Sequence, residues 1–186
     1  MARATRPAVL ATAAGILGRA GYTGLTMEGV ALQSGVAKTT LYRHWPTKAA
    51  LCMDLYLEEA GRELHDPDTG SVAEDLKRIV AAVVRLQTKT VAGQAFVGLI
   101  AEAQINPGSR EAFLAEFAKR RRRLTRTVLQ RAIERGEVRA DVDVDLVIDV
   151  IGGATTFRLL QGHAPLNRRF ADALVELVLA GAGRKR

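Results

Sequence analysis

Cysteine, histidine and aromatic residues are scarce in this chain of 186 residues. Cys52 is the single cysteine, so no disulfide can form within the chain, and a reducing compartment is the expected environment. The three histidines, His44, His65 and His163, are isolated, and no pair has the spacing of metal ligands on one helix. A glycine-rich phosphate loop and a nucleophile motif are also missing. We therefore expect no metal, no cofactor and no enzymatic activity.

Long apolar runs are absent as well. No segment approaches the ~20 apolar residues that a membrane-spanning helix requires. Arg3 and Arg6 precede an apolar stretch at residues 8–18, as charged residues do in a signal peptide. Thr12 interrupts this stretch and Arg19 follows it at once, so we interpret it as a packing helix. The sequence predicts a cytoplasmic protein without a membrane partner.

Acidic residues are nearly absent from the first fifty positions, where Glu28 is the only one. The same segment holds six Lys or Arg residues, so it carries +5 of the formal net charge of +7 and leaves +2 for the other 136 residues. A concentration of one sign on a small module is typical of proteins that contact nucleic-acid phosphates. The hydrophobic fraction of 48% provides material for a buried core and argues against disorder.

Helical periodicity recurs throughout, and strand patterns are nearly absent, which predicts an all-α fold with about nine helices. The expected helices cover residues 7–20, 26–34, 37–45, 48 through 56, 71–89, 92–104, 109–135, 144–160 and, after a loop at 162–165, the residues through 180. We predict two domains. Residues 1–50 form a helix-turn-helix domain, and residues 51–186 form a helical regulatory, ligand-binding and dimerisation domain.

Turn formers and capping residues support these boundaries. Thr26, Thr47 and Asp143 are suited to accept hydrogen bonds at helix N-termini. Gly21 and Gly136 are suited to end helices.

The helices at 26–34 and 37–45, joined through Gly35 and Val36, have the pattern of a helix-turn-helix. Apolar anchors for its packing are Leu25, Val30, Val36, Leu41, Tyr42 and Trp45. The side chains left outward on the second helix are Lys38, Thr39, Thr40, Arg43 and His44. Hydroxylated and basic groups at the start of such a helix suit the DNA major groove. The helix that Thr26 caps offers free N–H groups to a phosphate.

The string GVAKTTLYRHWPTKAAL, which begins at Gly35, resembles the TetR family of bacterial transcriptional repressors. Thr26, the pair Val30–Ala31 and Lys48 also fit that family's pattern. Two positions depart from it, because Ala37 replaces a frequent capping serine and Trp45 replaces the more usual phenylalanine. The resemblance implies a homodimer that binds an inverted-repeat DNA operator and is released by a small-molecule effector held in the C-terminal domain.

By this resemblance, Lys38, Thr39 and Thr40 read bases, while other side chains bind phosphates. The full expected DNA-binding set is Thr26, Lys38, Thr39, Thr40, Tyr42, Arg43, His44 and Lys48. Several of these have structural alternatives. Tyr42 could lie wholly in the core, where its hydroxyl would need a buried partner. Independently, His44 could be an ordinary surface histidine and Lys48 a solvated cation. Arg3 and Arg6 either enter a minor groove or belong to a tail.

Two helices near the C-terminus predict a dimer interface. The helix at 144–160 contains Gly152 and Gly153, whose cost of about 1 kcal/mol each relative to alanine requires close packing in return. The expected four-helix interface with a symmetry mate uses Ile151, Gly152, Thr155, Leu159, Phe170, Leu174, Leu177 and Val178. The alternative is that this stripe is core within one chain.

An effector pocket is expected among apolar and aromatic side chains of the central helices. The candidates are Met53, Tyr56, Phe96, Leu99, Gln104, Phe113, Phe117 and Phe157. The run Lys119–Arg123 encircles its helix, so we interpret it as a solvated surface with Arg120 or Arg121 turned inward. Cys52 lacks a resolving partner, which argues against a redox sensor.

Three functions compete. The favoured one is a sequence-specific transcriptional regulator, a repressor that a small molecule releases from its operator. The alternative is an architectural DNA-binding protein that senses no ligand and discriminates little between sequences. The third is a ligand-binding protein whose N-terminal region no longer binds DNA.

Overall fold

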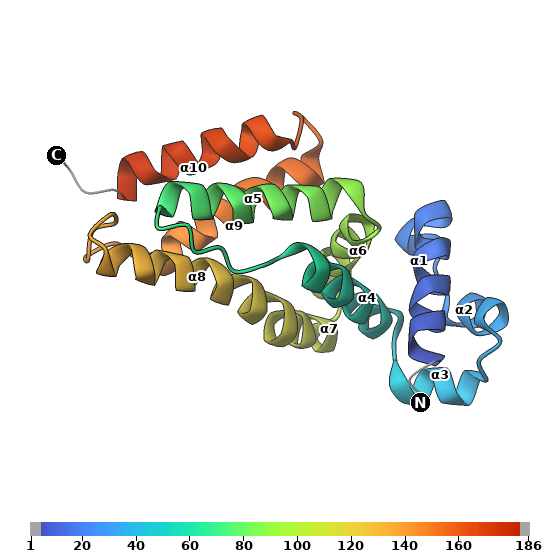
Figure 1. Ribbon diagram of the computed structural model, residues 1–186. Helices are drawn as coiled ribbons and strands as arrows, with labels where there is room; N and C mark the ends of the chain where they lie inside the picture. Colours follow the sequence, from blue (N-terminus) through green and yellow to red (C-terminus); the bar gives the residue numbers. More distant parts are fainter. Residues whose placement is uncertain (1–4, 183–186) are drawn as a thin grey trace. The chain divides into compact units, whose positions relative to one another are not determined.

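The computed structural model describes residues 5–182, apart from the side chains of residues 5, 112 and 116–121. Within this range the chain forms ten α-helices and one π-helical segment (Figure 1). The α-helices are α1 (Thr5–Gly24), α2 (Met27–Ser34), α3 (Lys38–His44), α4 (Lys48–Glu63), α5 (Val72–Lys89), α6 (Ala92–Ile105), α7 (Pro107–Ala112), α8 (Lys119–Glu134), α9 (Val144–Gln161) and α10 (Arg168–Ala182). The prediction of an all-α fold is confirmed.

The boundaries differ from the predicted ones at two places. Gly21 has a left-handed φ of 67°, so the regular part of α1 breaks where a terminator was predicted, but one further turn follows. The single helix predicted at 109–135 is instead α7, a π-helical turn at Phe113–Ala118, and α8. A π-helical turn inserts an extra residue without leaving the helical path, so apolar periodicity alone does not reveal it.

The described helices group into two compact units by their contacts. Unit 1 contains residues 5–61 and 89–117, and unit 2 contains residues 62–88 and 118–182. This grouping differs from the predicted division after residue 50. Its physical reason is that α4 continues without a break from Lys48 to Glu63, while α6 packs against α1.

The first three helices, here called the head, form a small core of their own within unit 1. Val9 and Leu17 from α1, Val30 from α2, and Leu41 from α3 are completely buried. Trp45 closes this core at the end of α3, and its indole N–H donates to Asp54 Oδ2 of α4 over 3.1 Å. A larger core in unit 2 joins α5, α8, α9 and α10 through side chains such as Leu76, Val128, Leu129, Ile151 and Val175.

The segment between α4 and α5 is pinned within unit 2. Thr69 donates its N–H and hydroxyl to the buried carboxylate of Asp75, and Arg131 of α8 binds Asp66 over 2.8 Å. None of the helices within residues 5–182 combines the length and apolar character needed to cross a membrane.

Candidate nucleic-acid interface

Local sequence places α3 on the surface of the head. Thr26 accepts a hydrogen bond from the Gly29 N–H over 3.0 Å, so it caps α2 as predicted. Gly35 then adopts φ 70°, a left-handed conformation that glycine adopts without strain, and ends α2. Ala37 provides no side-chain cap for α3, in agreement with the departure seen in the sequence. The tight turn orients α3 so that Leu41 is buried.

The opposite face of α3 carries the polar side chains. Lys38, Thr39, Arg43 and His44 are exposed, and Thr40 is half-buried. Within the part of the chain that the structure describes, Lys38 and Arg43 form no ion pair. Two cations and two hydroxyls therefore share one solvent-facing surface, and neither cation is held in an ion pair within the described residues.

Tyr42 is 40% exposed rather than wholly in the core. Its hydroxyl donates to Glu28 Oε1 over 2.8 Å, which joins α3 to the first turn of α2. This hydrogen bond lowers the pKa of Glu28 and, from the other side, raises the pKa of Tyr42. Sequence reasoning counted Glu28 only as an acid and missed this contact. A phosphate bound by Tyr42 would compete with the Glu28 carboxylate.

Lys48 opens α4 and is half-buried. Its ammonium donates to the backbone oxygen of Tyr22 over 3.1 Å and lies 4.3 Å from the centroid of the Tyr22 ring. It is therefore not a freely solvated cation. An ammonium has three N–H donors, so two stay available after the bond to Tyr22.

Arg6 belongs to α1 and is engaged by α4. Its Nε donates to Asp54 over 3.0 Å, and the guanidinium also reaches Glu58. Arg6 would have to leave these carboxylates to enter a minor groove. Arg3 lies outside the described residues.

Three of the predicted pocket residues form an aromatic cluster in unit 1. The ring of Phe96 lies 5.8 Å from that of Tyr56 and 6.3 Å from that of Phe113, measured between centroids. Two other candidates, Met53 and Leu99, line a groove of about 530 Å³ beside the α3–α4 turn and the start of α7. That volume lies in the range of small-molecule sites.

The other predicted pocket residues are placed differently. Gln104 is exposed on α6, and Phe157 is 60% exposed on α9 of unit 2. The centroid of the Phe157 ring lies 5.4 Å from that of His163, and nothing among the described residues of unit 2 supports Phe157 as a pocket residue. The side chain of Phe117 lies outside the described residues, as do those of Lys119, Arg120 and Arg121. Gln87 of α5 was missed: it is buried, and neither amide atom has a hydrogen-bond partner among the described residues.

Cys52 is buried within α4. Burial raises the pKa of its thiol to about 12, although the charge of Lys48 acts in the opposite direction. The thiol is thus protonated at neutral pH and shielded, which agrees with the argument against a redox sensor.

The structure shows how the residues of the predicted dimer interface are buried within one chain, and the interface itself stays a prediction. Ile151, Thr155, Leu174 and Val178 are buried in unit 2 itself, where the Thr155 hydroxyl donates to the Ile151 carbonyl. Gly152, Leu159 and Phe170 are half-buried, and Arg158 lies 4.0 Å over the Phe170 ring. Only Leu177 of the predicted set is largely exposed, at 71%.

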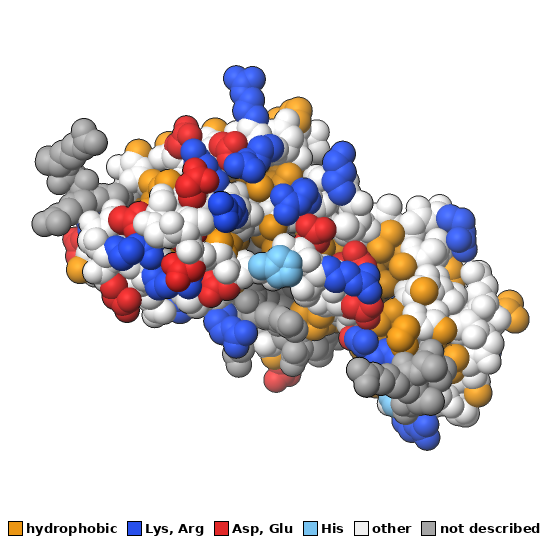
Figure 2. Space-filling view, in the orientation of Figure 1, with side chains coloured by type: hydrophobic (Ala, Val, Ile, Leu, Met, Phe, Trp, Pro, Cys, Tyr) orange, Lys and Arg blue, Asp and Glu red, His pale blue; other side chains and the backbone are white. Residues whose placement is uncertain are grey.

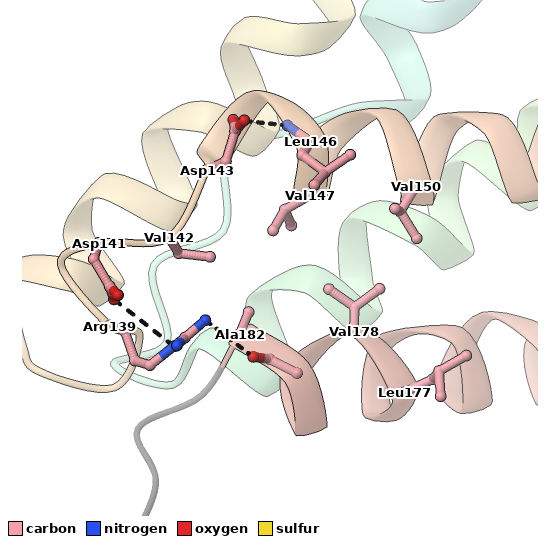
Figure 3. A pocket seen from close by; sticks show the side chains of 11 residues that line it. Arg139, Asp141, Val142, Asp143, Leu146, Val147, Val150, Leu177, Val178 and Ala182 are labelled. Atoms are coloured by element: carbon pink, nitrogen blue, oxygen red, sulfur yellow. Dashed lines mark hydrogen bonds and ion pairs between the residues drawn. The ribbon is translucent and has the colours of Figure 1, made fainter.

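Other apolar side chains of the same two helices face solvent instead. They are Leu146, Val150, Phe157 and Leu160 on α9, together with Leu177 on α10, and we call them the exposed α9–α10 face. A groove of about 340 Å³ continues this face (Figure 3). In it Val150 and Leu177 line the apolar part, while Arg139 and Asp141 form an ion pair at one end.

Comparison with known proteins places this geometry in a family. Residues 9–54 match the family described as bacterial regulatory proteins, tetR family. Residues 66–178, more than half of the chain, match the tetracyclin repressor-like C-terminal domain. The chain belongs to the TetR family. It is a helix-turn-helix, DNA-binding transcriptional regulator.

Relatives cover nearly the whole chain. It is 31% identical over 171 residues to the uncharacterized HTH-type transcriptional regulator YdeS of Bacillus subtilis, in a match that spans 92% of this chain and 86% of the relative. It is also 31% identical over 179 residues to the DNA-binding transcriptional repressor TetR of Mycobacteroides abscessus, with 92% and 90% covered. The crystal structure of the TetR family transcription regulator SCO0332 is 37% identical, has a TM-score of 0.81, and matches 97% of this chain and 99% of its own. These names favour a regulator over an architectural protein.

Proposed function

We propose that this TetR-family regulator is a homodimeric repressor that binds an inverted-repeat operator through α3 and leaves it when a small molecule binds. The observation that carries the proposal is the two-sided α3. Leu41 is completely buried on one side, while Lys38, Thr39 and Arg43 are exposed on the other, and the two cations form no ion pair with described residues. Lys38, Thr39 and Thr40 read base edges, and Thr26, Tyr42, Arg43, His44 and Lys48 bind phosphates.

Selection from random double-stranded oligonucleotides tests the DNA-binding part. A repressor should enrich an inverted repeat whose half-sites are about 34–36 Å apart, one helical turn of DNA. Its affinity for that site should exceed its affinity for unrelated DNA by a factor of about 10³ or more at physiological salt. A ratio near one would instead favour an architectural protein, and failure to bind any sequence would favour a ligand-binding protein without DNA function.

The dimer is proposed to form through the exposed α9–α10 face. Five large apolar side chains concentrated on two neighbouring helices favour association, because burying them removes apolar area from water. A dimer of this kind would give the two heads a fixed separation, which an inverted repeat requires.

A lysine on this face tests the dimer. Leu177→Lys would place an unpaired charge in the interface and should shift the protein to monomers in sedimentation experiments. Leu32 of α2 is 84% exposed, so Leu32→Lys introduces the same change outside the proposed interface and should stay dimeric. Equal oligomeric states for the two variants would contradict this interface.

The effector is proposed to contact the aromatic cluster of Tyr56, Phe96 and Phe113. Stacked and tilted rings favour a flat, largely apolar molecule, because aromatic faces bind such groups well. A screen of aromatic metabolites by thermal shift should identify ligands whose stabilisation is lost in Phe113→Ala. Stabilisation that is unchanged in this variant would argue against the cluster.

A further inference from the structure

Tyr22 occupies a position shaped by three helices of unit 1. It follows Gly21, the left-handed break in α1, and its ring lies against Gly98 of α6. A Cβ atom at position 98 would lie 2.1 Å from Cγ and Cδ2 of the Tyr22 ring, far inside van der Waals contact. Glycine at this position therefore forms a notch that admits the ring.

Tyr22 also contacts Lys48 of α4. The Lys48 ammonium donates to the Tyr22 backbone oxygen and lies over its ring, so one residue supplies both an acceptor and a π-face. Desolvation, followed by the proximity of Cys52 and Glu102, raises the pKa of the Tyr22 phenol. The ring is therefore neutral when it contacts the cation.

Helix α6 separates this arrangement from the aromatic cluster. Phe96 and Gly98 are two residues apart, so they project about 200° from each other around the helix axis. One face of α6 contacts Tyr56 and Phe113 through Phe96, and the nearly opposite face receives Tyr22. A displacement of α6 relative to α1 would therefore change the Gly98 notch.

We infer that Tyr22 is a positioning residue for Lys48 and the contact through which α6 controls the availability of this ammonium to a DNA phosphate. The inference rests on the proposed function, in which Lys48 binds phosphate. A free lysine side chain loses up to about 2 kcal/mol of rotamer entropy when it is held in place. Because Tyr22 already holds the Lys48 side chain in the free protein, part of this entropy is lost before DNA binds. Two N–H donors of the ammonium stay available for the phosphate. When the Tyr22 ring leaves the notch, Lys48 loses this preorganisation.

The salt dependence of DNA binding tests the inference on the full-length protein and its selected DNA site. Each phosphate contact contributes about 0.9 to the slope of log K against log salt. Gly98→Ala should drive the ring out and remove the Lys48 phosphate contact in both subunits, so the slope for the dimer should fall by about 1.8. Wild-type affinity should thus fall about 12-fold more than that of the variant between 50 and 200 mM salt. Tyr22→Phe retains the ring and the backbone oxygen and should keep the wild-type slope.

A double-mutant cycle separates positioning from damage to α6. In a Tyr22→Ala background, Gly98→Ala should have no further effect on the slope, because no ring is left to displace. A Cβ atom added at Gly61 of α4 would meet no other atom within 4 Å, so Gly61→Ala is a matched glycine control and should leave the slope unchanged. Additive effects of the two substitutions, or an unchanged slope in folded Gly98→Ala, would overturn the inference.

A second measurement needs no DNA and separates this inference from the proposed function. Lys48 should react slowly with an amine-selective reagent in the wild type and in Tyr22→Phe, and several-fold faster in Gly98→Ala. Equal labelling rates would refute the role of Tyr22 even if the protein binds its operator. Faster labelling of Gly98→Ala together with a wild type that binds no DNA would refute the proposed function alone.

Discussion

The α3 surface of the head and the helices of unit 2 differ in whether their basic side chains form ion pairs. In unit 2, Arg122 binds Asp145 and Asp149, Arg131 binds Asp66, and other arginines are paired in the same way. Basic and acidic side chains accordingly lie next to one another over the unit 2 helices in view (Figure 2). On α3, by contrast, Lys38 and Arg43 have no ion-pair partner among the described residues.

This difference teaches that the positive charge a surface can offer to a phosphate depends more on ion pairing than on the number of Lys and Arg residues. Exposed ion pairs contribute little to stability, but each cancels a charge that would otherwise attract DNA. Arg6 illustrates the point within the head itself, because Asp54 and Glu58 already engage it. Counting cations in the first fifty residues therefore overstates the positive field, which depends on the unpaired ones.

The largest expected effect comes from substitutions in the core of the head or in the core of unit 2, made separately. Leu41 of α3 and Leu129 of α8 are both completely buried, so replacing either with alanine should lower the free energy of unfolding by about 2–5 kcal/mol. Leu41→Ala should abolish DNA binding while the dimer persists. Chemical denaturation, DNA titration and sedimentation measure the three quantities. Dissociation of the dimer in Leu41→Ala would contradict separate roles for the head and unit 2.

The next prediction compares a cation without an ion pair, Lys38, with a cation that forms one, Arg122. Lys38→Ala should weaken binding to the preferred DNA by about 1–3 kcal/mol and relax the preference at one base position. Arg122→Ala, the paired control from unit 2, should leave affinity and preference unchanged. Binding assays on a set of singly substituted operators measure both. If Lys38→Ala leaves the preferred sequence intact, Lys38 does not read a base.

Two helix caps allow a smaller test. Thr26 caps α2 in the head and Asp143 accepts from the Leu146 N–H at the start of α9, so each alanine variant should lose about 1 kcal/mol of stability. Only Thr26→Ala should also weaken DNA binding, since its helix lies beside α3. Thermal unfolding with parallel DNA titrations tests this, and equal effects of both variants on DNA binding would contradict a phosphate contact at Thr26.

The smallest expected effect concerns pH. Partial desolvation, and then the charge of Arg43, lower the pKa of His44 below 6.5, so His44 is mostly neutral at pH 7. A bound phosphate would raise that pKa, so DNA affinity should increase as the pH falls below about 6.5. The salt slope should rise by at most about 1.8, because the dimer presents two His44 side chains. His44→Gln should show a flatter profile; an identical profile would exclude His44 as a phosphate contact.

Local chemistry made much of the head predictable. Thr26 and Thr47 act as caps because an oxygen before a helix satisfies its first N–H groups, and this depends only on neighbouring residues. Leu41 and Trp45 are recognisable as core because the rest of α3 is polar. The direction in which Lys38 and Thr39 point follows from the same pattern.

The burial pattern of α9 and the Tyr22 notch could not be predicted by such reasoning. Helix α9 has apolar residues on both sides, so its periodicity does not separate Ile151, which is buried, from Val150, which is exposed. Gly98 is one of several small residues in α6, and only the three-dimensional approach of Tyr22 gives it a role. Long-range contacts of this kind leave no signature in sequence spacing.

Trp45 gives the molecule an internal optical probe. It is the only tryptophan in the chain, it is buried at the end of α3, and its indole contacts the Asp54 carboxylate. Its fluorescence should therefore respond selectively to what happens around the head, because tyrosines can be avoided by choosing the excitation wavelength. Docking onto DNA and melting of the head can be followed in the unlabelled protein, without the signal of unit 2.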